Sequence, residues 1–181
     1  ERLARFGRVT GTDLADQVLK QAAARWPAVN FVAGDFMTLD LPLASFDVVV
    51  STFGVMFTPD QDRAAAELLR VCRSGGKIGL ANWTPEGFIG RLFKVIGAHV
   101  PPPAGLKSPA LWGTLAHLAE LFDVSPARIR CERRVFNFRY RSPAHWVQVF
   151  RDFYGPTHKA FAALPGERGQ ALERDIIALL E

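Results

Sequence analysis

The first half of the chain alternates short apolar segments with stretches of helical spacing. Strand-like segments lie at 8–14, 30–33, 46–50 and 77–80. Helical spacing follows the first of them over Asp16–Arg25 and the third after Asp60, a residue suited to begin a helix. Strands that alternate with helices form parallel sheets, so the pattern predicts an α/β fold with helices on both faces of the sheet.

The second half has a different pattern. A turn at 84–87 precedes an amphipathic helix over 88–100, and a short helix is expected around 115–122 after a proline run. Alternating aromatic residues predict a strand over 128–140. Ser142-Pro143 is typical of a helix start, for a helix that ends at Gly155. The last helix is expected over 167–180.

Acidic residues follow the first two predicted strands. Asp13 ends the first, and Gly34-Asp35 follows the second. Open parallel sheets bind ligands at the carboxyl ends of their strands, so both carboxylates are expected at that edge. Each residue also has a purely structural interpretation, because Asp13 could cap the helix that follows and Asp35 could form an Asx turn.

Taken in order, these segments resemble a class I S-adenosylmethionine-dependent methyltransferase. The similarity is to the type 11 branch that includes ubiquinone and menaquinone biosynthesis enzymes. It rests on four segments that have the family's order and spacing: 8–14, 34–36, 46–57 and 75–80. The resemblance implies a Rossmann-like methyltransferase fold, S-adenosylmethionine as cofactor and a small-molecule substrate.

The resemblance also implies roles for individual residues. Asp13 would accept hydrogen bonds from the ribose hydroxyls of the cofactor, and Leu14 would pack on its adenine. Gly34-Asp35-Phe36 would meet the adenine amino group, and Ser51 would lie near the methionine part.

Two departures from the family matter. Met56-Phe57 stands where many relatives have a His pair, so no base and no catalytic residue is assigned. The family also begins with a strand and a Gly-rich turn, and it ends with a further strand, none of which is found here. We therefore expect residues 1–181 to form a single incomplete methyltransferase domain that is inactive by itself. The missing first strand would lie between those ending near Asp13 and Ser51.

An apolar segment follows the last of the four strands. Residues 84–126 are interpreted as a helical lid over a mainly apolar substrate, with Trp83, Phe88 and Leu92 lining its pocket. The alternative is that these side chains only pack in a core.

The amino-acid composition bears on membrane, disulfide-rich, metal-binding and nucleic-acid-binding classes of protein. The 181 residues are 49% hydrophobic, and no apolar run reaches the ~18 residues of a membrane span. Two cysteines make no disulfide framework and favour a cytoplasmic location. No cysteine–histidine spacing indicates a metal site. Arginines are dense over 128–141, but the solvated face of a strand is favoured over a nucleic-acid patch, and the sequence gives no oligomeric state.

Two other functions stay open. An Asp after a second strand also suits the ribose of NAD(P), as in a Rossmann oxidoreductase. A non-catalytic binding subunit could keep the same fold without turnover.

Overall fold

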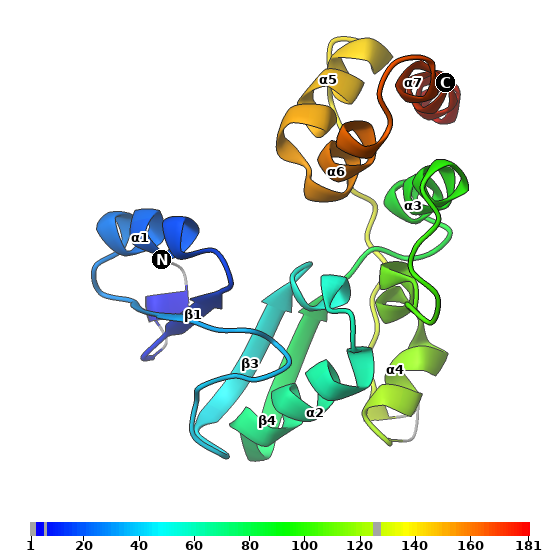
Figure 1. Cartoon of the computed structure of the whole chain (residues 1–181). Coiled ribbons are helices and arrows are strands. Elements are labelled where there is room, and N and C mark those ends of the chain that lie inside the picture. The colour runs from blue at the N-terminus through cyan, green and yellow to red at the C-terminus, as the bar shows by residue number, and fades with distance from the viewer. Residues whose placement is uncertain (1–2, 6, 125–127) are drawn as a thin grey trace. The chain divides into compact units, whose positions relative to one another are not determined.

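The computed structural model describes residues 3–5, 7–124 and 128–181, and the chain divides into two compact units, Glu1–Leu80 and Ala81–Glu181 (Figure 1). The first unit contains the strands and two helices. The second is mainly helical and extends well beyond the 84–126 expected for a lid. The elements assigned to the first unit, the last of which crosses the boundary, are η1 (Leu3–Arg5), β1 (Thr10–Asp13), α1 (Asp16–Arg25), β2 (Asn30–Ala33), β3 (Phe46–Thr52), η2 (Val55–Phe57), α2 (Gln61–Val71) and β4 (Cys72–Ala81).

The first strand pair is parallel. β1 and β2 pair with Thr10 opposite Asn30 and Asp13 opposite Ala33. Helix α1 connects them and has the predicted bounds; it stops before Pro27, which disfavours helical backbone at the residue preceding it. A helix between two parallel strands is the βαβ unit that the sequence pattern predicts.

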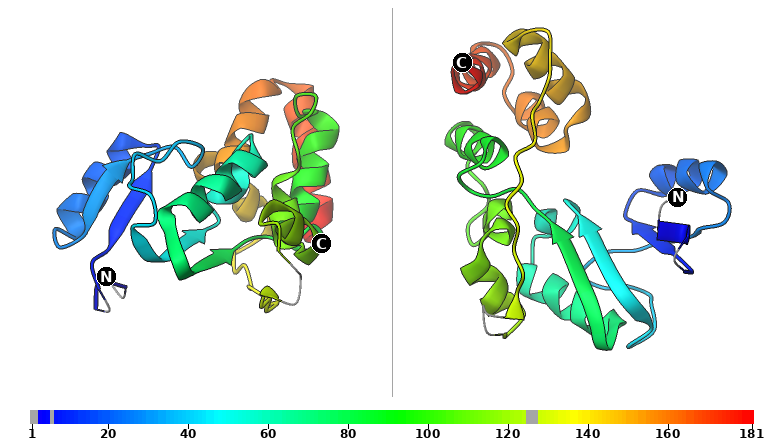
Figure 2. Two further views of the ribbon diagram at one scale, coloured as in Figure 1. Left: turned by 90° about the horizontal axis from the view of Figure 1, so that it is seen from below. Right: turned by 180° about the vertical axis from the view of Figure 1, so that it is seen from behind.

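The second strand pair is formed by β3 and β4, with α2 between them. Their arrows point the same way in Figure 2. The Asp60 side chain accepts a hydrogen bond from the Arg63 N–H at 2.9 Å, which confirms Asp60 as the N-cap of α2. Leu68 and Val71 on this helix are each 1% exposed. The α/β fold with parallel strands is therefore confirmed.

The position of the glycine pair differs from the prediction. Gly75-Gly76 was expected as a turn before the last strand, but β4 begins at Cys72 and contains both. Gly75 has a positive φ of 74°, and a Cβ on Gly76 would lie 2.9 Å from the Asp47 carbonyl oxygen of β3. Glycine therefore permits a kink and a close strand approach within β4.

The two strand pairs are separate. Among the described residues, β1 pairs with β2 and β3 pairs with β4, and these make two two-stranded sheets.

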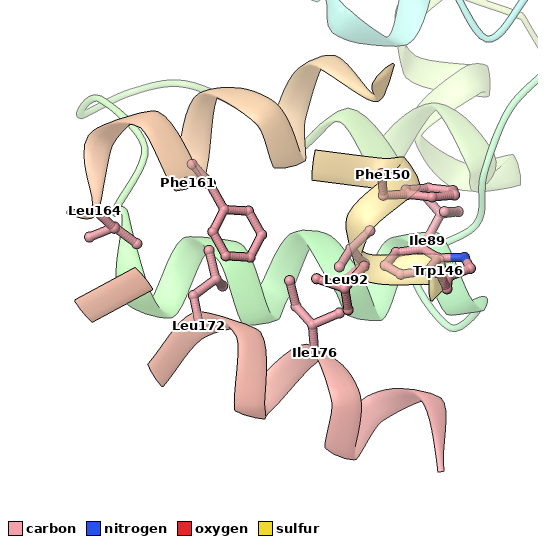
Figure 3. Packing of buried hydrophobic residues seen from close by; sticks show 10 residues of the cluster. Ile89, Leu92, Trp146, Phe150, Phe161, Leu164, Leu172 and Ile176 are labelled. Atoms are coloured by element: carbon pink, nitrogen blue, oxygen red, sulfur yellow. The ribbon is translucent and has the colours of Figure 1, made fainter. Parts of the chain in front are cut away.

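The second unit has its own hydrophobic core. Its helices are α3 (Phe88–His99), η3 (Pro109–Gly113), α4 (Leu115–Leu121), α5 (Pro143–Phe153), α6 (Gly155–Ala163) and α7 (Glu167–Leu180). The buried side chains come from α3, α5, α6 and α7, with Leu92, Leu172 and Ile176 at 0% exposure (Figure 3). The Ser142 hydroxyl accepts from the His145 N–H at 3.1 Å, so the predicted start of α5 is confirmed.

Two predictions for this unit are wrong. α5 ends at Phe153, and Gly155-Pro156 begins a further helix, α6, because proline is compatible with the first turn of a helix. Residues 129–140 form no strand. Only Phe138 of the alternating aromatic residues packs on the helical core, whereas Phe136 is 66% and Tyr140 38% exposed. No described strand pairs with the backbone of this segment. The alternation therefore predicts neither a fully covered face nor a partner strand here.

The core predicts a large difference between two identical substitutions. Leu172→Ala removes a fully buried side chain, whereas Leu115 on α4 is 42% exposed. We expect Leu172→Ala to lower the free energy of unfolding by about 2–5 kcal/mol and Leu115→Ala by less than about 1 kcal/mol. Denaturant unfolding of both variants measures the difference, and equal losses would contradict this core assignment.

Candidate functional site

The carboxyl ends of β1 and β2 form the edge at which the predicted site residues meet. Because the strands are parallel and Asp13 is opposite Ala33, the residues after each strand continue from the same end of the pair. The Gly34 N–H donates to the Asp13 carbonyl oxygen at 3.0 Å, which extends the pairing by one residue. The structure therefore brings Asp13 and Gly34-Asp35 together, as the sequence predicts.

Asp13 is exposed and has one carboxylate oxygen in use. Its Oδ1 accepts from the Ala15 N–H at 2.9 Å. The N-cap position of α1 is Ala15, which makes no side-chain cap, so the capping interpretation of Asp13 is wrong and a local turn replaces it. Among the described residues nothing hydrogen-bonds to the other oxygen. The adjacent Leu14 side chain is 70% exposed.

Asp35 has a similar arrangement. Its Oδ1 accepts from the Met37 N–H at 2.8 Å, and its carbonyl oxygen accepts from the Thr38 N–H at 2.9 Å. The Asx-turn interpretation is thus confirmed, and it uses one carboxylate oxygen only. Asp13 and Asp35 can therefore each stabilise a turn with one oxygen and meet a ligand with the other.

Gly34 allows a close approach between the two strands. A Cβ at this position would collide with the Thr12 Oγ1 atom, and it would lie 3.3 Å from Leu39. The Thr12 hydroxyl is buried and has no hydrogen-bond partner among the described residues. Sequence reasoning missed Thr12, because a threonine in a strand is ordinary and only the structure shows its buried oxygen.

Phe36 links this edge to the loop after β3. A Cβ on Gly54 would lie 3.2 Å from the Phe36 ring and 3.7 Å from the Ser51 hydroxyl, so these three residues are neighbours. Between them Phe53 has a φ of 62°, a conformation that a bulky residue rarely adopts outside a constrained loop. Gly54 and Phe53 were not predicted, and their conformation gives no sequence signal.

Ser51 is held within the protein. It is 3% exposed, and its hydroxyl accepts from the Val55 N–H at 3.0 Å at the start of η2. Its side chain therefore stabilises the loop after β3 and positions that loop's backbone. Met56 is fully buried, whereas Phe57 is 42% exposed.

Helix α2 fixes the segment that follows Asp35. Arg70 donates to the Leu39 carbonyl at 2.7 Å and to the Leu41 carbonyl at 2.8 Å, and the Glu67 carboxylate accepts from the Leu39 N–H at 2.9 Å. Arg70 Nε also lies 2.7 Å from Glu67 Oε1. About two turns before Arg70, Arg63 donates to the Met37 carbonyl at 2.8 Å. These contacts hold a loop without regular structure against a helix.

Glu67 and Arg70 also shift each other's pKa. The hydrogen bond from Arg70 is the main cause that lowers the pKa of Glu67 below 4.5, with the Leu39 N–H adding to it and burial opposing it. The same pairing raises the pKa of Arg70. Glu67 is therefore ionised throughout the neutral range and holds Arg70 toward the two carbonyls.

The predicted substrate residues lie in the second unit. The Trp83 and Phe88 rings are partly buried and lie 5.9 and 5.7 Å from the Phe138 ring. Leu92 is fully buried among residues of α3, α5 and α7, so it supports this core. Leu92 therefore packs in the hydrophobic core of the second unit, whereas the roles of Trp83 and Phe88 in a substrate pocket stay predictions.

The described residues contain no group of three or more His, Cys, Asp or Glu side chains that could hold a metal ion. None of the described helices has the length and apolar character needed to cross a bilayer. Cys72 and Cys131 are free thiols.

Comparisons with known proteins agree with the resemblance found in the sequence. Residues 1–80 match the family model described as a methyltransferase domain. An uncharacterized protein of Mycobacterium tuberculosis is 38% identical over 86% of this chain and 59% of its own length. The demethylmenaquinone methyltransferase of Deinococcus radiodurans is 31% identical over 74% of this chain and 58% of its own length.

A solved structure extends the comparison to the whole fold. A putative methyltransferase from an antibiotic biosynthesis pathway of Anabaena variabilis aligns with a TM-score of 0.52 at 19% identity, over 99% of this chain and 73% of that one. This supports the Rossmann-like fold. The chain spans less than two thirds of the length of the two curated proteins above.

The Glu67–Arg70 pair predicts a pH-dependent contribution to stability. Because the folded-state pKa of Glu67 is lowered, its contribution is complete above the ordinary value of 4.5 and is lost as the pH falls through the lower folded pKa. We expect Glu67→Gln to lower the free energy of unfolding at neutral pH, and the difference from wild type to shrink below about pH 4.5.

Denaturant unfolding across this pH range measures the effect. Glu167→Gln is the matched control, since Glu167 is exposed and has no ion pair among the described residues. A Glu67→Gln difference that grows on acidification, or one that is no larger than the control at neutral pH, would contradict the assignment.

Proposed function

We propose that the protein transfers a methyl group from S-adenosylmethionine to a small, mainly apolar molecule, because residues 1–80 match the model of a methyltransferase domain. The observation that carries the proposal is the shared edge of β1 and β2, where Asp13 and Asp35 lie. In each of these residues Oδ1 stabilises a local turn, and the second carboxylate oxygen is left for a ligand.

The residues at this edge fit the adenosine half of the cofactor. A ribose offers two hydroxyl donors, which suit the free oxygen of Asp13, and an adenine ring suits the exposed Leu14 side chain. The Asp35 carboxylate would accept a hydrogen bond from the adenine amino group. Gly34 keeps the backbone open at this point, since any side chain there would collide with Thr12.

The loop after β3 is proposed to position the methionine end. Ser51 would act through its hydrogen bond to the Val55 N–H rather than through a free hydroxyl. The Phe36 ring, which lies beside Gly54, would hold the two loops in register. No described group in this loop is an evident base, so no catalytic residue is proposed.

The cofactor would supply a methyl group on a positively charged sulfur, which leaves as the neutral thioether when a nucleophile takes the methyl. The protein then has to align the acceptor with that bond and exclude water. Trp83 and Phe88 are proposed to contribute to the acceptor side, because both are aromatic and only partly buried. Mass spectrometry of products formed from labelled cofactor and a metabolite extract would identify the acceptor.

The family match favours methyl transfer over the dinucleotide-dependent oxidoreductase. The demethylmenaquinone methyltransferase of Deinococcus radiodurans makes an aromatic quinone-type acceptor a reasonable first candidate. Cofactor binding without any methylated product would identify the non-catalytic alternative. The cytoplasmic location stays a prediction.

The central residue of the proposal is tested by two matched substitutions. In the full-length protein, Asp13→Ala should weaken S-adenosylmethionine binding by about ten- to a hundredfold, because the ribose hydroxyls lose a charged acceptor. Asp47→Ala should change it little, since Asp47 is exposed and pairs with Arg73 at 2.6 Å on the β3–β4 sheet. Calorimetric titration measures both.

A third variant separates binding from folding. Asp13→Asn keeps an oxygen that can accept from the Ala15 N–H but removes the charge, so it should preserve the turn and still weaken binding. Equal dissociation constants for the Asp13 and Asp47 variants would contradict the assignment of Asp13.

A further inference from the structure

Glu67 and Arg70 of α2 hold both backbone groups of Leu39. The Glu67 Oε2 atom accepts from the Leu39 N–H at 2.9 Å, and Arg70 Nη2 donates to the Leu39 carbonyl at 2.7 Å. Arg70 Nη1 donates to the Leu41 carbonyl at 2.8 Å, and Arg70 Nε lies 2.7 Å from Glu67 Oε1. The guanidinium therefore uses all three of its nitrogens in a fixed geometry, which a lysine ammonium does not reproduce.

The residue held in this way lies close to Asp35. Leu39 is 8% exposed, and a Cβ on Gly34 would lie 3.3 Å from its side chain, so Leu39 packs beside the residue that precedes Asp35. Between them, Asp35 Oδ1 accepts from the Met37 N–H, and the Asp35 carbonyl accepts from the Thr38 N–H. This turn is fixed at its start by the pairing of β1 with β2 and at its end by the contacts with α2.

We propose that Glu67 and Arg70 are positioning residues for recognition of the cofactor's adenine. They hold the loop so that the second carboxylate oxygen of Asp35 lies where the adenine amino group binds. Recognition of a single amino group requires its acceptor to be held within about 0.5 Å, which a loop without regular structure does not achieve by itself. The inference rests on the proposed function, because it takes S-adenosylmethionine as the cofactor.

Two ligands that differ at one position measure this recognition. S-adenosylhomocysteine, the product that the cofactor leaves after methyl transfer, has the adenine amino group, and its 6-deamino analogue has hydrogen there. We expect the full-length wild type to bind S-adenosylhomocysteine about tenfold more tightly or better, because the amino group donates to a charged acceptor. Calorimetric titration gives both dissociation constants. Their ratio is the readout, because a general loss of folded protein weakens both ligands alike.

Two variants in the pair test the positioning role. Arg70→Lys keeps the charge but loses the fork of donors, so we expect the ratio to fall to about threefold or less. Glu67→Gln loses the charged acceptor of the Leu39 N–H and should lower the ratio in the same direction. Arg73→Lys is the matched control, because Arg73 pairs with Asp47 at 2.6 Å on the β3–β4 sheet, and it should keep the wild-type ratio.

A third variant covers the case in which Arg70→Lys does not fold. Arg63 is exposed and donates to the Met37 carbonyl at 2.8 Å, within the turn that Asp35 begins. Arg63→Ala should therefore fold and lower the ratio about twofold or more.

The outcomes separate this inference from the proposed function. A wild type that prefers S-adenosylhomocysteine, with the same ratio in Arg70→Lys or Glu67→Gln, would overturn the positioning role alone. Where Arg70→Lys does not fold, an unchanged ratio in Arg63→Ala has the same meaning. A wild type that binds both ligands equally would overturn the inference and leave methyl transfer standing. A wild type that binds neither ligand would contradict the proposed function and the inference with it.

Discussion

The parallel pairing of β1 with β2 is the constraint on which the candidate site depends. With Asp13 opposite Ala33, the segments that leave both strands begin at one edge, and the two carboxylates lie there as a consequence. A slip of one residue would turn each side chain to the other face of the sheet. The close contact of Gly34 with Thr12 fits this register, because only a residue without a Cβ allows it.

Polar contacts from α2 fix the loop that follows β2, which no strand pairing holds in place. The segment after Asp35 has little regular structure, yet Arg70 and Glu67 bind both the N–H and the carbonyl of Leu39. Glu67 and Arg70 thus bind the backbone of the loop after Asp35 as well as each other. The strands set where the site residues begin, and α2 sets where the loop goes next.

Local signals made much of this fold predictable. The bounds of α1, β2 and α7 follow from periodicity and flanking residues, and two N-caps were identified from Asp60 and Ser142 alone. The acidic strand ends also predicted that Asp13 and Asp35 lie at the same edge of the strand pair, which the parallel register of β1 and β2 confirms.

The errors arise where a distant partner decides the outcome. Residues 129–140 have the alternation of a strand, but a strand also needs a neighbour, which sequence periodicity does not supply. The contact of Arg70 with Leu39 spans 31 residues and gives no local signal. The use of the Ser51 hydroxyl by η2 and the buried oxygen of Thr12 depend on packing in the same way.

The most direct test of the account is a crystal structure of the full-length protein with S-adenosylhomocysteine, the demethylated product of the cofactor. We expect its ribose hydroxyls within hydrogen-bond distance of the Asp13 carboxylate. Its adenine ring should lie against Leu14, with the adenine amino group facing Asp35. A product bound elsewhere, or a ribose that does not contact Asp13, would contradict the account.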